Sequence, residues 1–144
     1  MKTLLGLLMA THLLFAGLPF NLENLTQLRL YVVNQSEFID AAREEAIRTH
    51  VLKRLREKGF VFGERDSSTF FVKIESLHVN DSDVINTQIG VGEQSDVQRG
   101  KAIQTFAFTY YANDLIESQA PYSDMMESLN FLIDEFLAQY EEDR

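Results

Sequence analysis

Residues 27–59 read QLRLYVVNQSEFIDAAREEAIRTHVLKRLREKG, and this stretch decides the fold. Its first part, residues 27–33, alternates and is rich in β-forming side chains, which predicts a strand. The next part predicts a helix from Ser36 to about Lys58, because Ser36 is a good N-cap residue and an apolar stripe recurs at helical spacing. Gly59 follows the cationic last turns and is the residue type expected just after a helix C-terminus.

The chain that follows predicts four more strands and a closing helix. The strands are expected at residues 60–62, 69–79, 84–91 and 101–112. A loop is expected over residues 92–100, and residues 113–121 are expected to lead into a helix from about Ser123 to Tyr140 with a broad apolar face. The predicted order of elements is therefore β-α-β-β-β-β-α. Short polar turns join the middle strands, so antiparallel pairing is expected.

This order predicts an α+β fold in a single domain over residues 21–144. Two amphipathic helices must bury their stripes on one face of a mainly antiparallel sheet of four or five strands, which gives a two-layer sandwich. On the last long strand, Phe106, Phe108 and Tyr110 are expected to face the same way. The opposite sheet face meets solvent or a partner, and its predicted side chains are Phe71, Lys73, Glu75, Asn86, Gln88 and Tyr111.

Residues 1–20 have the layout of a secretory signal peptide. Lys2 supplies a positive charge, residues 4–15 are uncharged and mostly apolar, and small residues with a proline follow. Cleavage after Ala16 is the expected outcome. Two alternatives stay open: an N-terminal membrane anchor that is retained, and a buried N-terminal helix of the domain. An apolar core this short falls below the roughly 20 residues of a comfortable membrane span.

The composition excludes several classes of function. The chain has 144 residues, no Cys and a net charge of -9. An acidic chain is a poor partner for nucleic acid, since phosphate contacts need clustered cations. The absence of Cys excludes disulfides, thiol nucleophiles, Cys-ligated metals and a lipid-anchored lipoprotein. An exported domain without Cys fits the bacterial periplasm, although three N-glycosylation triplets begin at Asn24, Asn34 and Asn80.

The chain has three histidines, the residue type most often used for acid–base chemistry and for binding metals. His12 lies in the leader, His50 on the flank of the first helix stripe, and His78 near a strand end. No paired-histidine spacing of a metal site is present. We therefore expect both His50 and His78 to be structural boundary residues.

The other chemical motifs are incomplete as well. Ser67-Ser68 lacks the G-x-S-x-G context of a nucleophile elbow. Gly90-Val91-Gly92 has no helix after it, which favours a strand end or bulge over a phosphate loop. Asp81 and Asp83 begin like a calcium loop that then lacks its later ligands, which favours a turn. The carboxylate pairs are expected on exposed helix faces, at Glu44-Glu45, Asp134-Glu135 and Glu141-Glu142. No catalytic residue, metal site or cofactor is predicted.

Charge is distributed unevenly along the chain. Residues 43–65 hold seven cations and four anions, whereas residues 114–144 hold nine anions and one cation. One interpretation is docking onto an acidic partner, anionic headgroups or a second copy. The other is complementation of helix dipoles together with ion pairs between the two helices.

In layout, residues 27–140 are similar to small bacterial envelope domains, namely auxiliary lipoproteins of transporters and activators of peptidoglycan synthesis. Those domains also place a strand, a long helix, a meander and a closing helix behind an export signal. The expected function is an exported, non-catalytic binding or accessory domain of the cell envelope, with a protein partner or self-association. One alternative is a small periplasmic enzyme or ligand binder with a pocket between helices and sheet. The other is a subunit tethered to the inner membrane by residues 1–20.

Overall fold

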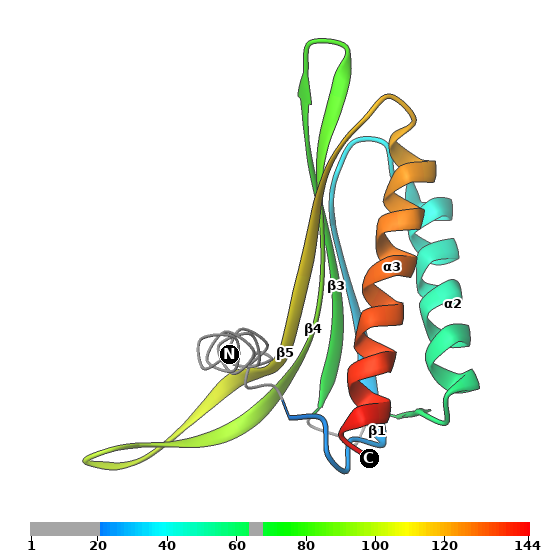
Figure 1. Cartoon of the computed structure of the whole chain (residues 1–144). Coiled ribbons are helices and arrows are strands. Elements are labelled where there is room, and N and C mark those ends of the chain that lie inside the picture. Colours follow the sequence, from blue (N-terminus) through cyan, green and yellow to red (C-terminus); the bar gives the residue numbers. More distant parts are fainter. Residues whose placement is uncertain (1–20, 64–67) are drawn as a thin grey trace, which may run out of the picture.

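Two helices cover one face of a five-stranded sheet in the computed structural model, which describes residues 21–63 and 68–144 (Figure 1). The predicted two-layer α+β sandwich and its element order are therefore confirmed. The elements are β1 Gln27–Gln35, α2 Ala41–Glu57, β2 Val61–Phe62, β3 Thr69–Val79, β4 Ser82–Arg99, β5 Lys101–Ser118 and α3 Pro121–Glu142.

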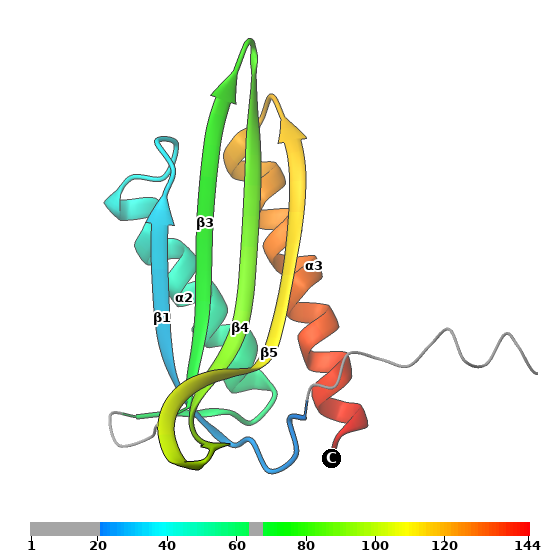
Figure 2. The same cartoon turned by 90° about the vertical axis from the view of Figure 1, so that its left-hand side faces the viewer.

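The sheet is mixed, in the order β2-β1-β3-β4-β5. β3, β4 and β5 pair antiparallel, as their short turns predict, but β1 pairs parallel with both β2 and β3. The reason is the crossover. α2 carries the chain back along the sheet, so the next strands start at the same end as β1. Figure 2 shows β1 at one side of the sheet and β5 at the other, with the helices behind.

α2 begins later than the N-cap preference of Ser36 predicts. Asp40 is the N-cap, and its carboxylate accepts a hydrogen bond from the Arg43 backbone N–H at 2.8 Å. The Ser36 hydroxyl donates instead to the Asn34 side chain near the end of β1, at 2.7 Å. The predicted stop is confirmed, because Gly59 has φ +94°, a left-handed conformation that glycine adopts without strain.

β4 and β5 form a hairpin far longer than predicted. The expected loop at 92–100 is the second half of β4, and residues 113–118 continue β5. β3 pairs with β4 only as far as Gly92, so residues 93–107 project as a two-stranded arm. The arm bends away from the helices (Figures 1 and 2). Its polar residues meet water on both faces, which is why this segment lacks the alternation of a half-buried strand.

A β-bulge at Thr109 changes which side chains share a face. Val91 pairs with Tyr110, but Gly92 pairs with Phe108, so Thr109 is the extra residue. The expectation that Phe108 and Tyr110 face the same way is therefore wrong. One inserted residue sends Tyr110 to the helix side, where it is 6% exposed, and leaves Phe108 on the opposite face.

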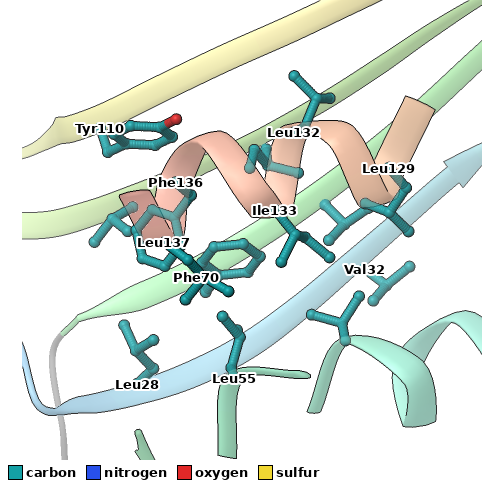
Figure 3. Packing of buried hydrophobic residues seen from close by; sticks show 14 of the residues in the cluster. Leu28, Val32, Leu55, Phe70, Tyr110, Leu129, Leu132, Ile133, Phe136 and Leu137 are labelled. Atoms are coloured by element: carbon teal, nitrogen blue, oxygen red, sulfur yellow. The ribbon is translucent and has the colours of Figure 1, made fainter. Parts of the chain in front are cut away.

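The core lies between the helices and the sheet (Figure 3). The Phe136 ring of α3 meets Phe70 of β3 and Tyr110 of β5 edge-on, each with ring centroids 5.1 Å apart. The α2 stripe contributes Ile47, Val51 and Leu55, all of which are fully buried. The predicted apolar faces of both helices are thus the ones that pack on the sheet.

α3 stays helical through Glu142, although the acidic residues at its C-terminus oppose the helix dipole. The Asp143 carboxylate accepts a hydrogen bond from the Leu22 backbone N–H at 2.9 Å. Within the part of the chain that the structure describes, no helix is long and apolar enough to cross a membrane. The predicted signal segment 1–20 and the turn residues 64–67 lie outside the described residues.

Candidate functional site: the open face of the sheet

The sheet face opposite the helices carries aromatic and polar side chains side by side, and we call it the open face. The predicted polar and aromatic residues do lie there together. Phe71 is paired with Gly90, and Glu75 with Asn86, across β3 and β4, while Gly90 pairs on its other side with Tyr111. No helix covers this face among the residues that Figure 1 describes.

Aromatic rings from three strands gather on this face. The Phe71 centroid lies 5.2 Å from that of Phe108 and 6.3 Å from that of Tyr111. The rings of Phe106 and Phe108 are 6.2 Å apart and nearly perpendicular. With Tyr31 of β1 they line a groove of about 430 Å³, which we call the open-face groove. These spacings match favourable aromatic pairs.

Much of this apolar surface faces water. Tyr31 is 63% exposed, Phe106 is 50% exposed and Phe108 is 59% exposed. Phe106 and Phe108 pair with Gln94 and Gly92, where the arm leaves the sheet, and both side chains line the groove. An exposed aromatic cluster of this kind is typical of a binding surface.

Two glycines of β4 make room for these rings. A Cβ at Gly90 would lie 2.4 Å from the Phe71 ring, and a Cβ at Gly92 would lie 2.2 Å from the Phe106 ring. The aromatic side chains therefore lie directly over the backbone of β4. The prediction of a strand end or bulge at Gly90-Val91-Gly92 is confirmed only in part, because these residues lie within β4, opposite the bulge residue Thr109 of β5. That the two glycines leave space for aromatic rings is not visible in the sequence.

A chain of polar contacts closes one end of the groove. The Tyr111 hydroxyl donates to the Gln88 side-chain oxygen at 3.1 Å, and the Gln88 amide donates to Glu75 at 2.7 Å. Glu75 also pairs with Lys73 at 2.7 Å. The hydrogen bond from Lys73 lowers the pKa of the Glu75 carboxyl, against the opposing effect of desolvation. At this end of the groove, the charges of Lys73 and Glu75 therefore neutralise one another.

The two described histidines lie away from the open-face groove. His50 Nε2 is 2.7 Å from Asn130 Oδ1, and the same oxygen accepts from Arg54 at 3.0 Å, so His50 belongs to the contact between α2 and α3. His78 Nδ1 is 3.3 Å from Asp83 at the exposed end of the β3–β4 hairpin. The structure does not bring the two histidines together.

The other motifs fall in turns and on surfaces. Asn80 has φ +55° and forms with Asp81 the tight turn predicted here, whereas Asp83 lies in β4, paired with His78. No group of three or more acidic or histidine side chains in residues 21–63 and 68–144 could hold a metal ion. Ser67 lies outside those ranges, and the Ser68 hydroxyl donates to Glu93 at 2.7 Å.

Ion pairs between the helices account for part of the uneven charge. Arg54 pairs with Asp134 at 2.5 Å, and Lys58 pairs with Glu141 at 2.7 Å. The hydrogen bond from Lys58 lowers the pKa of Glu141. Of the two interpretations of the uneven charge, ion pairing between the helices therefore applies to Arg54 and Lys58.

Sequence analysis places the polar residues of the open face correctly, but it misses three of the aromatic residues that line the groove. It does not place Tyr31, Phe106 and Phe108 on the open face, because their position depends on the parallel pairing of β1 and on the bulge. A search of known protein families and of curated proteins gives no match to this chain.

Proposed function

We propose that this chain is an exported, non-catalytic binding domain of the bacterial cell envelope that holds a protein partner on its open face. The observation that carries the proposal is the exposure of Tyr31, Phe106 and Phe108 around the open-face groove. Fully burying one large apolar side chain contributes about 1.5–3 kcal/mol. Covering these rings would therefore supply much of the free energy of a specific complex.

The partner segment is uncharged and apolar. The groove is walled by aromatic rings, and Lys73, the cation among its described lining residues, is already paired with Glu75. An extra charge placed there would lose its hydration without gaining a partner. A second copy of the chain is disfavoured as the occupant, because two molecules that each carry a charge of -9 repel one another.

Site-specific photo-crosslinking tests this proposal. Benzoylphenylalanine in place of Tyr31 samples the groove, and the same residue in place of Phe131 is the control, because Phe131 is 55% exposed on α3. In the native host, we expect position 31 to crosslink to one other protein through an uncharged apolar peptide, which mass spectrometry identifies. Equal adducts at both positions, no adduct at position 31, or an adduct with a second copy would each refute the proposal.

Export is part of the proposal and rests on residues 1–20 and the absence of Cys. The mass of the protein purified from its host tests this part separately. We expect a new N-terminus at Gly17, after cleavage behind Ala16. An intact Met1 would instead support the membrane-tethered alternative.

A further inference from the structure

A second groove lies along β1, on the helix side of the sheet edge. It has a volume of about 560 Å³ and is lined by apolar residues and three arginines, among them Leu30, Arg48, Leu52, Arg56 and Phe62. No acidic side chain of the described residues lines it, although the chain as a whole carries a charge of -9. We call it the β1-edge groove.

The backbone of β1 is exposed as a sheet edge along this groove. β2 pairs only with Gln27 and Leu28, and the remaining residues of β1 have no strand partner on that side within residues 21–63 and 68–144. The Leu28 carbonyl accepts from Gly63 on the β2 side, whereas the Arg29 N–H donates to Ser68 on the β3 side. Since neighbouring residues of a strand alternate in direction, the next outward-pointing backbone groups are those of Leu30 and Val32.

Two arginines of α2 stand beside this edge with N–H groups available. Arg56 lies over the Phe62 ring, with its Cζ 5.6 Å from the centroid, and makes no ion pair with a described carboxylate. Arg48 lies 3.7 Å from Glu45 and 4.0 Å from Glu44, longer than the roughly 2.7–2.9 Å of a strong charge-assisted hydrogen bond. A closer carboxylate would therefore compete well for Arg48.

The spacing along α2 matches that of an added strand. Arg48, Leu52 and Arg56 are four residues apart, so they form one stripe with a rise of about 6 Å per step. Every second side chain of a strand advances about 6.6 Å. A strand laid on the β1 edge would meet a cation, an apolar residue and a cation at three successive positions on one of its faces.

We infer that the β1-edge groove takes an extended acidic peptide as an extra strand, with carboxylates four residues apart and an apolar residue midway between them. Its backbone would pair with Leu30 and Val32, and its two carboxylates would meet Arg48 and Arg56. This is β-strand addition, in which the main chain supplies affinity and alternate side chains supply specificity. The site is distinct from the open-face groove and does not depend on it.

Binding of labelled seven-residue peptides to the full chain, measured by fluorescence anisotropy, tests this inference. The probe is Thr-Glu-Thr-Val-Thr-Glu-Thr. One control has Gln for both Glu residues, and another has the same composition with the two Glu residues adjacent. We expect the probe to bind at least about tenfold more tightly than either control. Equal binding of the rearranged peptide would refute the strand geometry.

Variants of the protein and of the peptide backbone locate the site. The double variant Arg48→Gln/Arg56→Gln should weaken binding about tenfold or more, whereas Lys53→Gln, which removes a cation from another face of α2, should leave binding unchanged. Methylation of the amides that face β1 should abolish binding, and methylation of the alternate amides should not. Far-UV circular dichroism confirms that each variant folds. Equal effects of the two methylation patterns would overturn the inference.

Two further measurements separate a peptide site at the β1 edge from a lipid-binding surface and from the open face. Vesicles of phosphatidylglycerol that bind the chain while the probe peptide does not would show a lipid surface and overturn the inference. The double variant Phe106→Ser/Phe108→Ser should bind the peptide like the unmodified chain, because both rings lie on the open face. Loss of peptide binding in that variant would place the peptide on the open face and also overturn the inference.

Discussion

At the residue scale, Gly90 and Gly92 differ in what lies over them. A Cβ at Gly90 would approach both the Phe71 ring and the Tyr110 backbone oxygen, at 2.4 and 2.6 Å. The three atoms nearest to a Cβ at Gly92 all belong to the Phe106 ring, which is the end of a rotatable side chain. Backbone cannot move aside as a ring can, so Gly90 is the more constrained position.

Gly90→Ala should therefore lower the free energy of unfolding by about 1–3 kcal/mol, the usual cost of overpacking. Gly92→Ala should cost less, because the Phe106 ring can swing outward. Gly63→Ala is the matched control, since no atom lies within 4 Å of its added Cβ. Urea unfolding followed by circular dichroism measures all three. Equal stability of the Gly90 and Gly63 variants would contradict the packing described here.

Tyr110 gives a pH-dependent prediction. Burial, and secondarily the charge of Glu135, raises the pKa of Tyr110 to about 12. Between pH 10 and about 12, the unfolded chain releases this proton while the folded chain keeps it, so stability falls as pH rises through that window. Tyr110→Phe should lessen this fall and remove the last step of the phenolate absorbance titration at 295 nm.

Tyr31→Phe is the control for the loss of one hydroxyl, because Tyr31 is exposed on the open face. Unfolding measured at pH 9, 10, 11 and 12 compares both variants with the unmodified chain. An identical loss of stability between pH 10 and 12 in Tyr110→Phe and the unmodified chain would show that Tyr110 is not responsible.

At the scale of elements, Asn130 links the two helices. Its side-chain oxygen faces both His50 and Arg54 of α2, at 2.7 and 3.0 Å. Asn130→Ala removes this shared acceptor and should lower stability by about 1–2 kcal/mol. Asn113→Ala is the matched control, since that amide is exposed and its contact with Asn86 is 3.5 Å long. Equal losses measured by urea unfolding would argue against the link.

The arm of β4 and β5 is an element without a core of its own. An isolated two-stranded ribbon is marginally stable in water, and only the sheet end of the arm is covered. Backbone amides of residues 95–105 should therefore exchange with deuterium at least tenfold faster than those of residues 70–75, which lie in the centre of the sheet. Mass spectrometry of the exchanged protein measures this, and equal protection would mean that another surface covers the arm.

Sequence patterns predict those elements whose signals are local. The stop of α2 at Gly59 and the alternation of β3 follow from neighbouring residues, and both are confirmed. The parallel pairing of β1 and the extent of the arm depend on residues far apart in the chain or on solvent at both faces. The open face could not be predicted in full for a similar reason. The single bulge residue Thr109 decides which aromatic rings lie on that face, and no local sequence pattern marks it.

At the scale of the whole molecule, the two helices stabilise one side of the sheet and leave the other for binding. The fully buried side chains lie on the helix side, where Phe70, Phe136 and Ile133 are in contact with the core. The rings of the open face are half exposed or more at Tyr31, Phe106 and Phe108. Stability and binding should therefore be separable by substitution.

The double variant Phe106→Ser/Phe108→Ser tests this separation most directly, with Phe131→Ser as the control for removing an exposed ring from α3. Thermal unfolding and crosslinking from benzoylphenylalanine in place of Tyr31 are measured on each. The open-face variant should keep its Tm within about 2 °C, the shift expected for roughly 0.5 kcal/mol, and lose its partner crosslink. The control should keep both. A large fall in Tm with the crosslink unchanged would show that these rings serve the fold, and would contradict the assignment of the open face to binding.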